Sequence, residues 1–373
     1  MNQKEFKMKN KIKIIQTVIK PTLEKSLYLI GSDLLGLLPD ILKERKITVG
    51  GIFLIVDKTV NSLYGQKLRI VLNKISDNLS VSEINPGEKS KNIENLPKII
   101  SPFFKTKIFK NLLIVAFGGG VVTDIAGFTA SILLRGIRCC LIPTTLLAQT
   151  DATIGGKNGM DYPLNGKLLK NMIGTIKQPD LVLTDVDLLK TLSDKEWRNG
   201  LAEIVKYALT FNKPVLDNSL IKKMKLKKEQ NLINLIYDCQ KIKLKIVEKD
   251  PFDTLHIREK LNLGHTIGHA IESSHHDKFS HGEAVSLGLA SIAFISRKMN
   301  LLPERKFDQI IKLLTELGLP TKINKLNFPA VLKSLKFDKK AGTFILMKDF
   351  GQLLTGQIVP ELLVIKALKQ ISS

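Results

Sequence analysis

The sequence contains little of what would define a secreted or membrane protein. Of its 373 residues only three are Cys, one is Trp, and aromatic residues make up 6%. An odd number of cysteines with no Cys-x-x-Cys pair argues against a disulfide framework and a metal knuckle, so we predict core thiols. The longest mostly apolar run, 284–296, is shorter than the ~20 residues that span a bilayer. Since no apolar block follows the lysine-rich N-terminus, we expect a soluble, cytoplasmic protein without a membrane partner.

Acidic residues are also under-represented. Lys and Arg number 57 against 35 Asp and Glu, a net charge of +22, yet only eight of the basic residues are Arg. A basic chain can bind nucleic acid by neutralising phosphates, but these lysines are spread along the whole chain and do not alternate with aromatic side chains, as a base-stacking surface requires. We favour a solvated, lysine-rich surface with no nucleic-acid partner. An anionic small-molecule substrate is compatible with either interpretation.

The hydrophobic pattern of the sequence divides the chain into two halves. Hydrophobic residues make up 44% of the chain, enough for a core, and the length suggests two domains. Apolar, β-branched runs at 52–57, 111–117 and 137–143 predict buried strands that alternate with helices such as 124–134. This alternation predicts an α/β domain with a largely parallel sheet. We place it at 1–185.

Beyond residue 185 helical periodicity dominates, and we expect 186–373 to form a mostly α-helical domain. The helical patterns lie at 188–207, 222–249, 261–274, 282–299 and 305–317. Two late strand patterns lie at 344–347 and 353–358. The cleft between the two halves is the default position for a ligand site.

A glycine turn follows the predicted strand 111–117. It reads Gly118-Gly119-Gly120 and leads through Val121 to Asp124. Such a turn lets the backbone approach a phosphate at the N-terminus of the next helix. Because the glycines lack the Gly-x-Gly-x-x-Gly spacing, they indicate a dinucleotide only moderately, and a tight strand–helix turn is the alternative.

Polar side chains follow the next strand. Thr144 and Thr145 end it, Asp151 follows, and a glycine turn carries Lys157. Ligands of open α/β sheets bind at the carboxyl ends of the strands, which favours a binding role. Helix capping is the alternative for the two threonines, but it accounts for neither Asp151 nor Lys157.

The most informative segment is 258–273, REKLNLGHTIGHAIES. If this segment is one helix, a single face carries Arg258, Asn262, His265, His269 and Glu272. A solvent-facing stripe is the alternative, yet this chain usually covers its surface with lysine and this face has none. Two histidines one turn apart can both bind a metal, or one can bind while the other transfers protons.

An acid on another helical segment completes a possible set of metal ligands. Glu203 lies three residues before Lys206, and His281 is a third candidate imidazole. A surface ion pair is the simple interpretation of the first two residues. Glu203 with two of the three histidines would instead form a three-ligand site with an open position, which is typical of catalytic zinc.

Together, in this order, these motifs resemble the 3-dehydroquinate synthase family over nearly the whole chain. The resemblance rests on GGGVVTDIAGFTAS, RGIRCCLIPTTLLAQTDATIGGK, KNMIGTIKQPDLVLTD, LKTLSDKEWRNGLAEIVKYAL, LNLGHTIGHAIE, HGEAVSLGL and FDKK. It implies an NAD-binding α/β domain followed by a mostly helical metal- and substrate-binding domain, and a homodimer. The ligands implied for a divalent metal, with zinc expected and cobalt compatible, are Glu203, His265 and His281.

The resemblance also implies the residues that surround NAD and the substrate. Those implied near NAD are Asp57, Glu88, Lys91, Gly119, Gly120, Val121, Asp124, Thr144, Thr145, Asp151, Lys157, Lys170, Leu188, Thr191, Leu192 and Glu196. Those implied for the anionic sugar phosphate are Arg135, Asp151, Lys157, Asn171, Lys206, Lys243, Arg258, Asn262, His269, and Lys339 or Lys340. Lys206, Arg258, Asn262 and His269 are implied to be catalytic, and Arg135 is expected to reach a neighbouring subunit's site.

The implied reaction converts 3-deoxy-D-arabino-heptulosonate 7-phosphate to 3-dehydroquinate and phosphate in the shikimate pathway of aromatic amino-acid biosynthesis. It comprises a transient oxidation by NAD+, phosphate elimination, return of the hydride and an intramolecular aldol closure. The sequence departs from the family pattern at Thr123, at Asn158, in the loop 163–170 and at Asp250-Pro251. The alternatives are an amino-dehydroquinate or valiolone-type synthase and a glycerol-type alcohol dehydrogenase.

Overall fold

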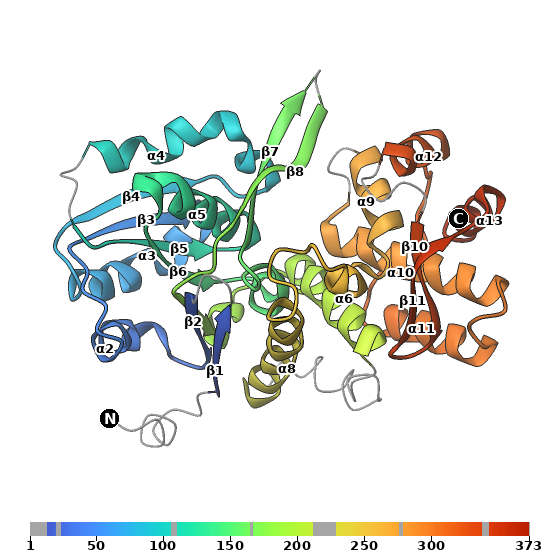
Figure 1. The fold of residues 1–373 in the computed structure, drawn as a ribbon, viewed down its shortest axis with the longest axis horizontal. Coiled ribbons are helices and arrows are strands. Elements are labelled where there is room, and N and C mark those ends of the chain that lie inside the picture. The colour runs from blue at the N-terminus through green and yellow to red at the C-terminus, as the bar shows by residue number, and fades with distance from the viewer. Residues whose placement is uncertain are drawn as a thin grey trace. The chain divides into compact units, whose positions relative to one another are not determined.

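Figure 1 shows a computed structural model in which residues 13–19, 24–105, 110–164, 167–211, 229–275, 279–337 and 343–372 are described. The chain forms two compact units. Unit 1 contains Met1–Leu192 and Glu229–Phe252, and unit 2 contains Ser193–Lys228 and Asp253–Ser373. A single division at residue 185 does not describe this arrangement, because helix α8 (Glu229–Val247) returns to unit 1.

Unit 1 is built on a sheet of seven strands within the described residues, in the order β1-β2-β9-β6-β5-β3-β4. Only β1 pairs antiparallel with its neighbour, so the predicted largely parallel sheet is confirmed. Their bounds are β1 Lys13–Ile19, β2 Glu24–Gly31, β3 Gly51–Asp57, β4 Leu79–Ile84, β5 Leu112–Gly118, β6 Arg138–Pro143 and β9 Leu181–Asp185. The three strands predicted from the sequence are β3, β5 and β6, each within one residue.

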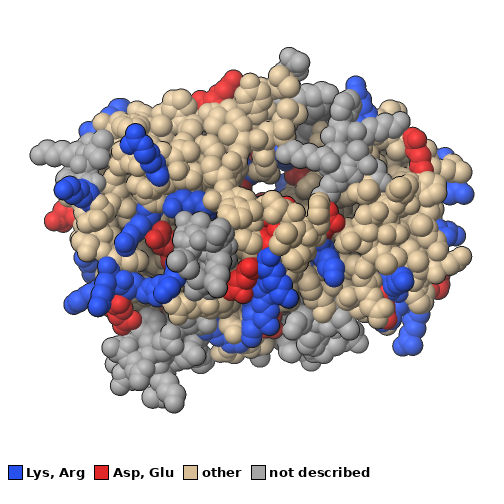
Figure 2. Space-filling model, in the orientation of Figure 1, with Lys and Arg blue, Asp and Glu red and all other residues tan. Residues whose placement is uncertain are grey.

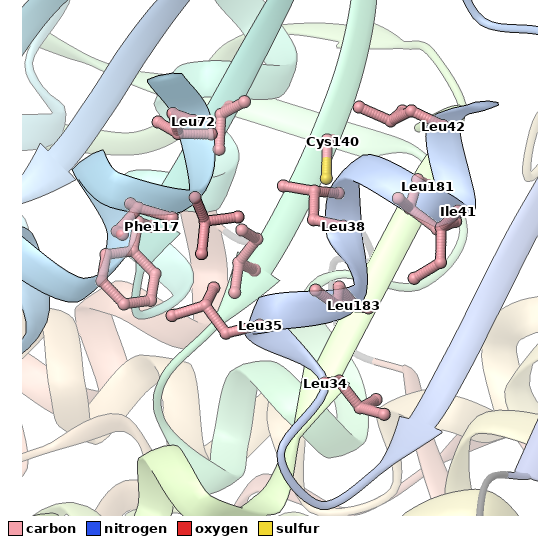
Figure 3. Close-up of a cluster of buried hydrophobic side chains, with 14 of the residues drawn as sticks. Leu34, Leu35, Leu38, Ile41, Leu42, Leu72, Phe117, Cys140, Leu181 and Leu183 are labelled. Atoms are coloured by element: carbon pink, nitrogen blue, oxygen red, sulfur yellow. The ribbon is translucent and has the colours of Figure 1, made fainter. Parts of the chain in front are cut away.

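Helices cover both faces of this sheet (Figure 1). Because successive side chains of a strand point to opposite faces, Leu54 and Val56 join one buried cluster while Phe53 and Ile55 join the other. Helices α2 (Leu38–Glu44) and α3 (Lys58–Asn73) complete the first cluster, and Figure 3 shows leucines of α2 beside Cys140 and Leu181. Helices α4 (Leu96–Phe104) and α5 (Gly120–Ile132) complete the second.

Helix α8 is joined to unit 1 by a buried amide network. The Nε2 atom of Gln240 donates to the backbone oxygen of Gln149 at 2.8 Å and to Oγ1 of Thr184 at 3.1 Å. The Nε2 atom of Gln149 in turn donates to the backbone oxygens of Pro143 and Asp185. These bonds connect α8 to the carboxyl ends of β6 and β9.

Unit 2 is mostly helical, as predicted. Helix α10 (His281–Lys298) is its centre and packs against α6, α9, α11, α13 and the hairpin strand β10. The other elements are α6 Asp194–Phe211, α9 His265–Ser274, α11 Glu304–Glu316, α12 Phe328–Phe337, α13 Glu361–Gln370, β10 Thr343–Asp349 and β11 Gln352–Ile358. The predicted helices 282–299 and 305–317 and the two late strands are therefore confirmed.

Smaller elements complete the two units. Unit 1 carries the hairpin β7 (Lys157–Leu164) and β8 (Lys167–Ile176). The short turns are η1 Leu35–Leu37, η2 Glu88–Lys91, η3 Ile93–Asn95, η4 Leu133–Arg135, η5 Ala148–Ala152, η6 Val186–Leu189 and η8 Ile257–Asn262. The helix expected over 188–207 begins only at Asp194, and the one expected over 222–249 is described from Glu229.

The charged surface and the cysteines have the positions that the composition predicted. On the face drawn in Figure 2, Lys and Arg are scattered over the described surface and interspersed with Asp and Glu. Cys139, Cys140 and Cys239 are buried, which confirms the prediction of core thiols. Among the described helices, none combines the length and the apolar character that a membrane crossing needs.

Candidate functional site

The acid predicted at position 203 is buried in the middle of α6. Its side chain is 0% exposed, and the ammonium of Lys206, one turn later, contacts its Oε2 atom. Burial of an unpaired carboxylate is costly, so a buried acid of this kind needs cations or donors around it. Burial alone would raise the pKa of Glu203, but Lys206 and the two imidazoles described next outweigh it and hold the pKa well below its usual range.

Two imidazoles converge on the other oxygen of this carboxylate. The Nε2 atoms of His265 and His281 lie 3.2 Å and 3.1 Å from Oε1 of Glu203. The three side chains therefore offer one oxygen and two nitrogens, all within 4.8 Å of one another. This donor set is one that a divalent metal such as zinc takes.

The second nitrogen of each ring faces an acceptor. Nδ1 of His265 lies 3.2 Å from the backbone oxygen of Leu263, and Nδ1 of His281 lies 3.6 Å from Oε2 of Glu272. Metal-binding histidines usually have such a partner, because it fixes the ring and the tautomer. Both rings thus present Nε2 to the same point. Desolvation opposes protonation of His281, but Glu203 and Glu272 raise its pKa to about 10, so a bound metal must displace a proton there.

Both histidines stand at the first residue of a helix. Gly264 precedes His265 with φ +78, and an added Cβ there would lie 2.9 Å from the backbone nitrogen of Leu289. Ser280 precedes His281 and forms a capping box with Glu283. A glycine and a serine therefore fix where the two helices start, and with them the two imidazoles.

The segment 258–273 is not one helix, and the helix predicted over 261–274 begins only at His265. The short turn η8 carries Arg258 and Asn262 and ends there, and α9 begins with His265 after Gly264, which is its N-cap. Arg258 is nevertheless buried, with 3% exposure. His269 stays on the predicted face of α9: its ring centroid lies 5.1 Å from that of His265 and 6.0 Å from that of His281. His269, Glu272 and His281 form a second group of metal-binding type that shares His281 with the first.

In unit 1 the predicted glycine turn connects β5 to α5. The N-terminus of α5 has no side-chain cap at Gly119, and an added Cβ at Gly119 would lie 3.0 Å from Cγ2 of Thr145. Thr145 also accepts a hydrogen bond from the backbone of Ala148 at 3.2 Å. The capping alternative therefore holds for Thr145, whereas Oγ1 of Thr144 is buried without a hydrogen-bond partner among the described residues.

Two ion pairs lie beside this turn in the fold of unit 1. Lys91 is buried and contacts Asp124 on α5 at 2.5 Å, with Glu88 at 3.6 Å. Nζ of Lys243 on α8 donates to both Oδ1 and the backbone oxygen of Asp151, each at 2.9 Å.

The hairpin β7–β8 carries three of the predicted residues. Lys157 and Asn171 are exposed and Lys170 is half-buried. Asn171 has φ +52, and its backbone N–H donates to Oδ1 of Asp161 at 2.8 Å. Asp161 is fully buried, so it anchors this strained backbone.

The remaining predicted residues have separate local environments. Arg135 is exposed with φ +65, and Oδ1 of Asp57 caps α3. Oγ1 of Thr191 lies 2.9 Å from the hydroxyl of Tyr64, and Val121 and Leu192 are half-buried while Leu188 is buried. Lys339 and Lys340 lie outside the described residues.

Sequence reasoning missed two polar side chains that orient predicted site residues, and it placed Glu272 on the predicted face without its contact to His281. Asp161 holds the backbone of Asn171, and Asn199 contacts the first turn of α10. Asn199 precedes a glycine within a helical pattern, which is the one signal that could have drawn attention to it. The other two contacts join residues that are far apart or on different elements.

Solved structures with this fold include sugar-phosphate cyclases. A structure of 2-deoxy-scyllo-inosose synthase complexed with carbaglucose-6-phosphate, NAD+ and Co2+ aligns with a TM-score of 0.85 at 22% identity, covering 96% of this chain and 100% of that chain. A 2-epi-5-epi-valiolone synthase from Streptomyces hygroscopicus with NAD+ and Zn2+ bound aligns with a TM-score of 0.77 at 24% identity, covering 92% and 96%. At these identities the likeness establishes the fold class.

Curated relatives are closer in sequence. A 3-dehydroquinate synthase of Lactococcus lactis is 40% identical over 314 residues, which cover 83% of this chain and 85% of the relative. One of Clostridium botulinum is 37% identical over 308 residues, covering 81% and 86%. Residues 81–199 match the family described as 3-dehydroquinate synthase N-terminal, and residues 200–341 match 3-dehydroquinate synthase C-terminal. The chain therefore belongs to the 3-dehydroquinate synthase family.

Proposed function

We propose that Glu203, His265 and His281 bind the divalent metal of a 3-dehydroquinate synthase reaction and that unit 1 binds its NAD. By its family the chain is a phosphate-eliminating cyclase, which converts 3-deoxy-D-arabino-heptulosonate 7-phosphate to 3-dehydroquinate and phosphate. The observation that carries the proposal is the convergence of two Nε2 atoms on one buried carboxylate oxygen.

The distances from Oε1 of Glu203 to the two Nε2 atoms fit a metal. Bonds of about 2.0–2.1 Å from nitrogen or oxygen to tetrahedral zinc put neighbouring ligand atoms about 3.3–3.4 Å apart. The two observed distances of 3.1 and 3.2 Å are close to that edge length. The acceptors on both Nδ1 atoms fit as well, because they leave Nε2 of each ring for the ion.

The side chains around the cluster have defined tasks in this proposal. Lys206 keeps Glu203 ionised, so the carboxylate is a ligand at neutral pH. Glu272 orients His281, and His269 is the adjacent imidazole available for proton transfer. When bound, NAD supplies a reversible hydride transfer and the metal polarises an alcohol oxygen. Related cyclases have been solved with NAD+ and either Co2+ or Zn2+, so we propose zinc, with cobalt as a functional substitute.

The glycine turn of unit 1 supports the assignment of NAD to that unit. The uncapped N-terminus of α5 has backbone N–H groups suited to a pyrophosphate. The buried hydroxyl of Thr144 is a further polar group without a protein partner among the described residues. The Lys91–Asp124 pair holds η2 against α5, next to this turn.

Substrate binding is assigned to the cations and amides that the family resemblance implied. We propose that Lys157, Lys243, Arg258, Asn171, Asn262 and His269 contact the carboxylate, the hydroxyls and the phosphate, together with Lys339 or Lys340 and with Arg135 of the partner subunit in a cytoplasmic homodimer. Fixed cations at both anionic ends restrict a flexible substrate to geometries that favour ring closure.

The test is phosphate release from the heptulosonate phosphate by purified chain supplied with NAD+ and Zn2+. We expect phosphate and 3-dehydroquinate in equal amounts, with no net accumulation of NADH, because the hydride is returned in each turnover. Absence of phosphate release would contradict the proposal. Net NADH production from a polyol would favour an alcohol dehydrogenase, and turnover only of a substrate without the carboxylate would favour a different cyclase.

A further inference from the structure

We propose that Asn199 is a positioning residue that holds His281 against Glu203, an inference that rests on the proposed metal site. Asn199 lies on α6, one turn before Glu203, and is 8% exposed. Its Oδ1 accepts a hydrogen bond from the backbone N–H of Gly282, the residue that follows His281 at the start of α10. The contact thus joins the two helices that supply the acid and one of the imidazoles.

The orientation of the Asn199 amide is fixed from its other side. Its Nδ2 atom donates to Oε2 of Glu196 at 3.2 Å, on the same helix. A carboxylate only accepts hydrogen bonds, so the amide nitrogen must face Glu196 and the amide oxygen must face Gly282. Glu196, Asn199 and Gly282 therefore form one directed chain of hydrogen bonds.

The N–H of Gly282 needs this partner. The first N–H groups of a helix have no acceptor within the helix, and Gly282 is buried. The capping box satisfies Glu283 through Oγ of Ser280, and Ala284 donates to the backbone oxygen of Ser280. Asn199, from another helix, supplies the acceptor for Gly282.

Glycine at 282 is what allows so close an approach. An added Cβ would lie 2.6 Å from Cα of Asn199 and 2.7 Å from its Oδ1, and would also overlap its backbone oxygen. Any other residue at 282 would push the first turn of α10 away from α6. Because His281 is adjacent in sequence, such a shift would lengthen the 3.1 Å separation between its Nε2 and Oε1 of Glu203.

The two contacts between α6 and α10 therefore form together. Asn199 and Glu203 are four residues apart and share a face of α6, while Gly282 and His281 are consecutive on α10. The third ligand, His265, is placed by α9 and Gly264 instead. Loss of the Asn199 contact should thus displace one imidazole and leave the other ligands in position.

The experiment is a Co2+ titration of metal-stripped, NAD-free protein followed by visible absorption. We expect Asn199→Ala and Gly282→Ala to weaken Co2+ binding by about 10- to 100-fold, the usual effect of losing a partner that orients a ligand, and to change the Co2+ bands, which report ligand geometry. Lys195→Ala, at an exposed position in the same turn of α6, is the matched control and should leave both unchanged.

A charge exchange separates positioning from general stabilisation. Asn199→Asp keeps an acceptor for Gly282 but faces the Glu196 carboxylate, so Co2+ affinity should fall. Adding Glu196→Gln supplies an amide donor to the new carboxylate and keeps the net charge, so the double variant should recover the affinity and the Co2+ bands of the wild type. A core substitution that only destabilised the fold would not be rescued by this exchange.

The outcomes distinguish this inference from the metal site itself. Wild-type protein that takes up no Co2+ would contradict the metal site, and the inference with it. Stoichiometric uptake by the wild type, together with unchanged affinity and bands in Asn199→Ala and Gly282→Ala, would overturn the role of Asn199 alone. If Asn199→Ala does not fold, Gly282→Ala and the charge exchange give the same decision.

Discussion

Lys206 and Glu203 form an ion pair within one turn of α6, and both side chains are almost completely buried. The ammonium of Lys206 also lies 4.8 Å from the centroid of the Tyr207 ring. A buried pair of charges is tolerated because each charge compensates the other, so the removal of one partner leaves the second buried without its main counter-charge.

We therefore predict that Lys206→Met destabilises the metal-free protein by about 3 kcal/mol, measured as the free energy of unfolding in urea. Lys190→Met is the matched control, because Lys190 pairs with Asp187 at the same spacing but is 71% exposed. Exposed pairs contribute under about 1 kcal/mol. Equal losses in the two variants would contradict the interpretation of the buried pair.

Removal of a proposed ligand should remove the metal without unfolding unit 1. We expect Glu203→Gln and His265→Ala to purify with little metal by elemental analysis and to lose activity, while NAD binding measured by calorimetry is largely retained, because the glycine turn lies in the other unit. His256→Ala, at a side chain that is 80% exposed, should keep its metal. A metal-free His265→Ala protein with full activity would refute the ligand assignment.

Gly264 should tolerate no side chain. Its φ of +78 and the nearby Leu289 backbone lead us to expect that Gly264→Ala costs at least about 2 kcal/mol of stability and weakens metal binding through the adjacent His265. Gly36→Ala is the control, because an added Cβ there meets no atom within 4 Å, and it should change the stability by less than about 0.5 kcal/mol. Thermal unfolding and Co2+ titration of both variants check this prediction.

Gln240 should be essential for the attachment of α8. Gln240→Leu removes the donors to Gln149 and Thr184, and the loss of these buried hydrogen bonds should cost about 1–3 kcal/mol. Gln230→Leu, at an exposed position on the same helix, should have little effect. If hydrogen exchange of the β9 amides is unchanged in Gln240→Leu, the proposed role of this contact is wrong.

The elements that the sequence predicted well are those with strong local patterns. The strands β3, β5 and β6 are buried on both faces, so they are continuous apolar runs flanked by turn residues. Helices α10 and α11 and strand β11 were also found within one residue, and β10 within two, because their apolar spacing is regular.

The sequence-based predictions fail where the position of an element or side chain depends on contacts with residues far away in the sequence. The helical pattern from Arg258 to Glu272 continues through Gly264, but the backbone turns there because α10 packs against that glycine. The return of α8 to unit 1 depends on Gln240 and its buried partners, which lie far away in sequence. The residue stripe contained His265 and His269 but not His281, and only the fold shows that His265 and His281, which lie on different helices, meet at Glu203.

The insertion of α8 has a consequence for synthesis and for dissection of this protein. A fragment that stops at Leu192 would lack a helix that completes its own unit, so the first unit cannot mature on the ribosome until the segment up to Phe252 has emerged. By then the ribosome has already made α6, so the segment that carries Glu203 is synthesised before unit 1 is complete. C-terminal truncations that end between Leu192 and Phe252 should therefore yield no soluble fragment.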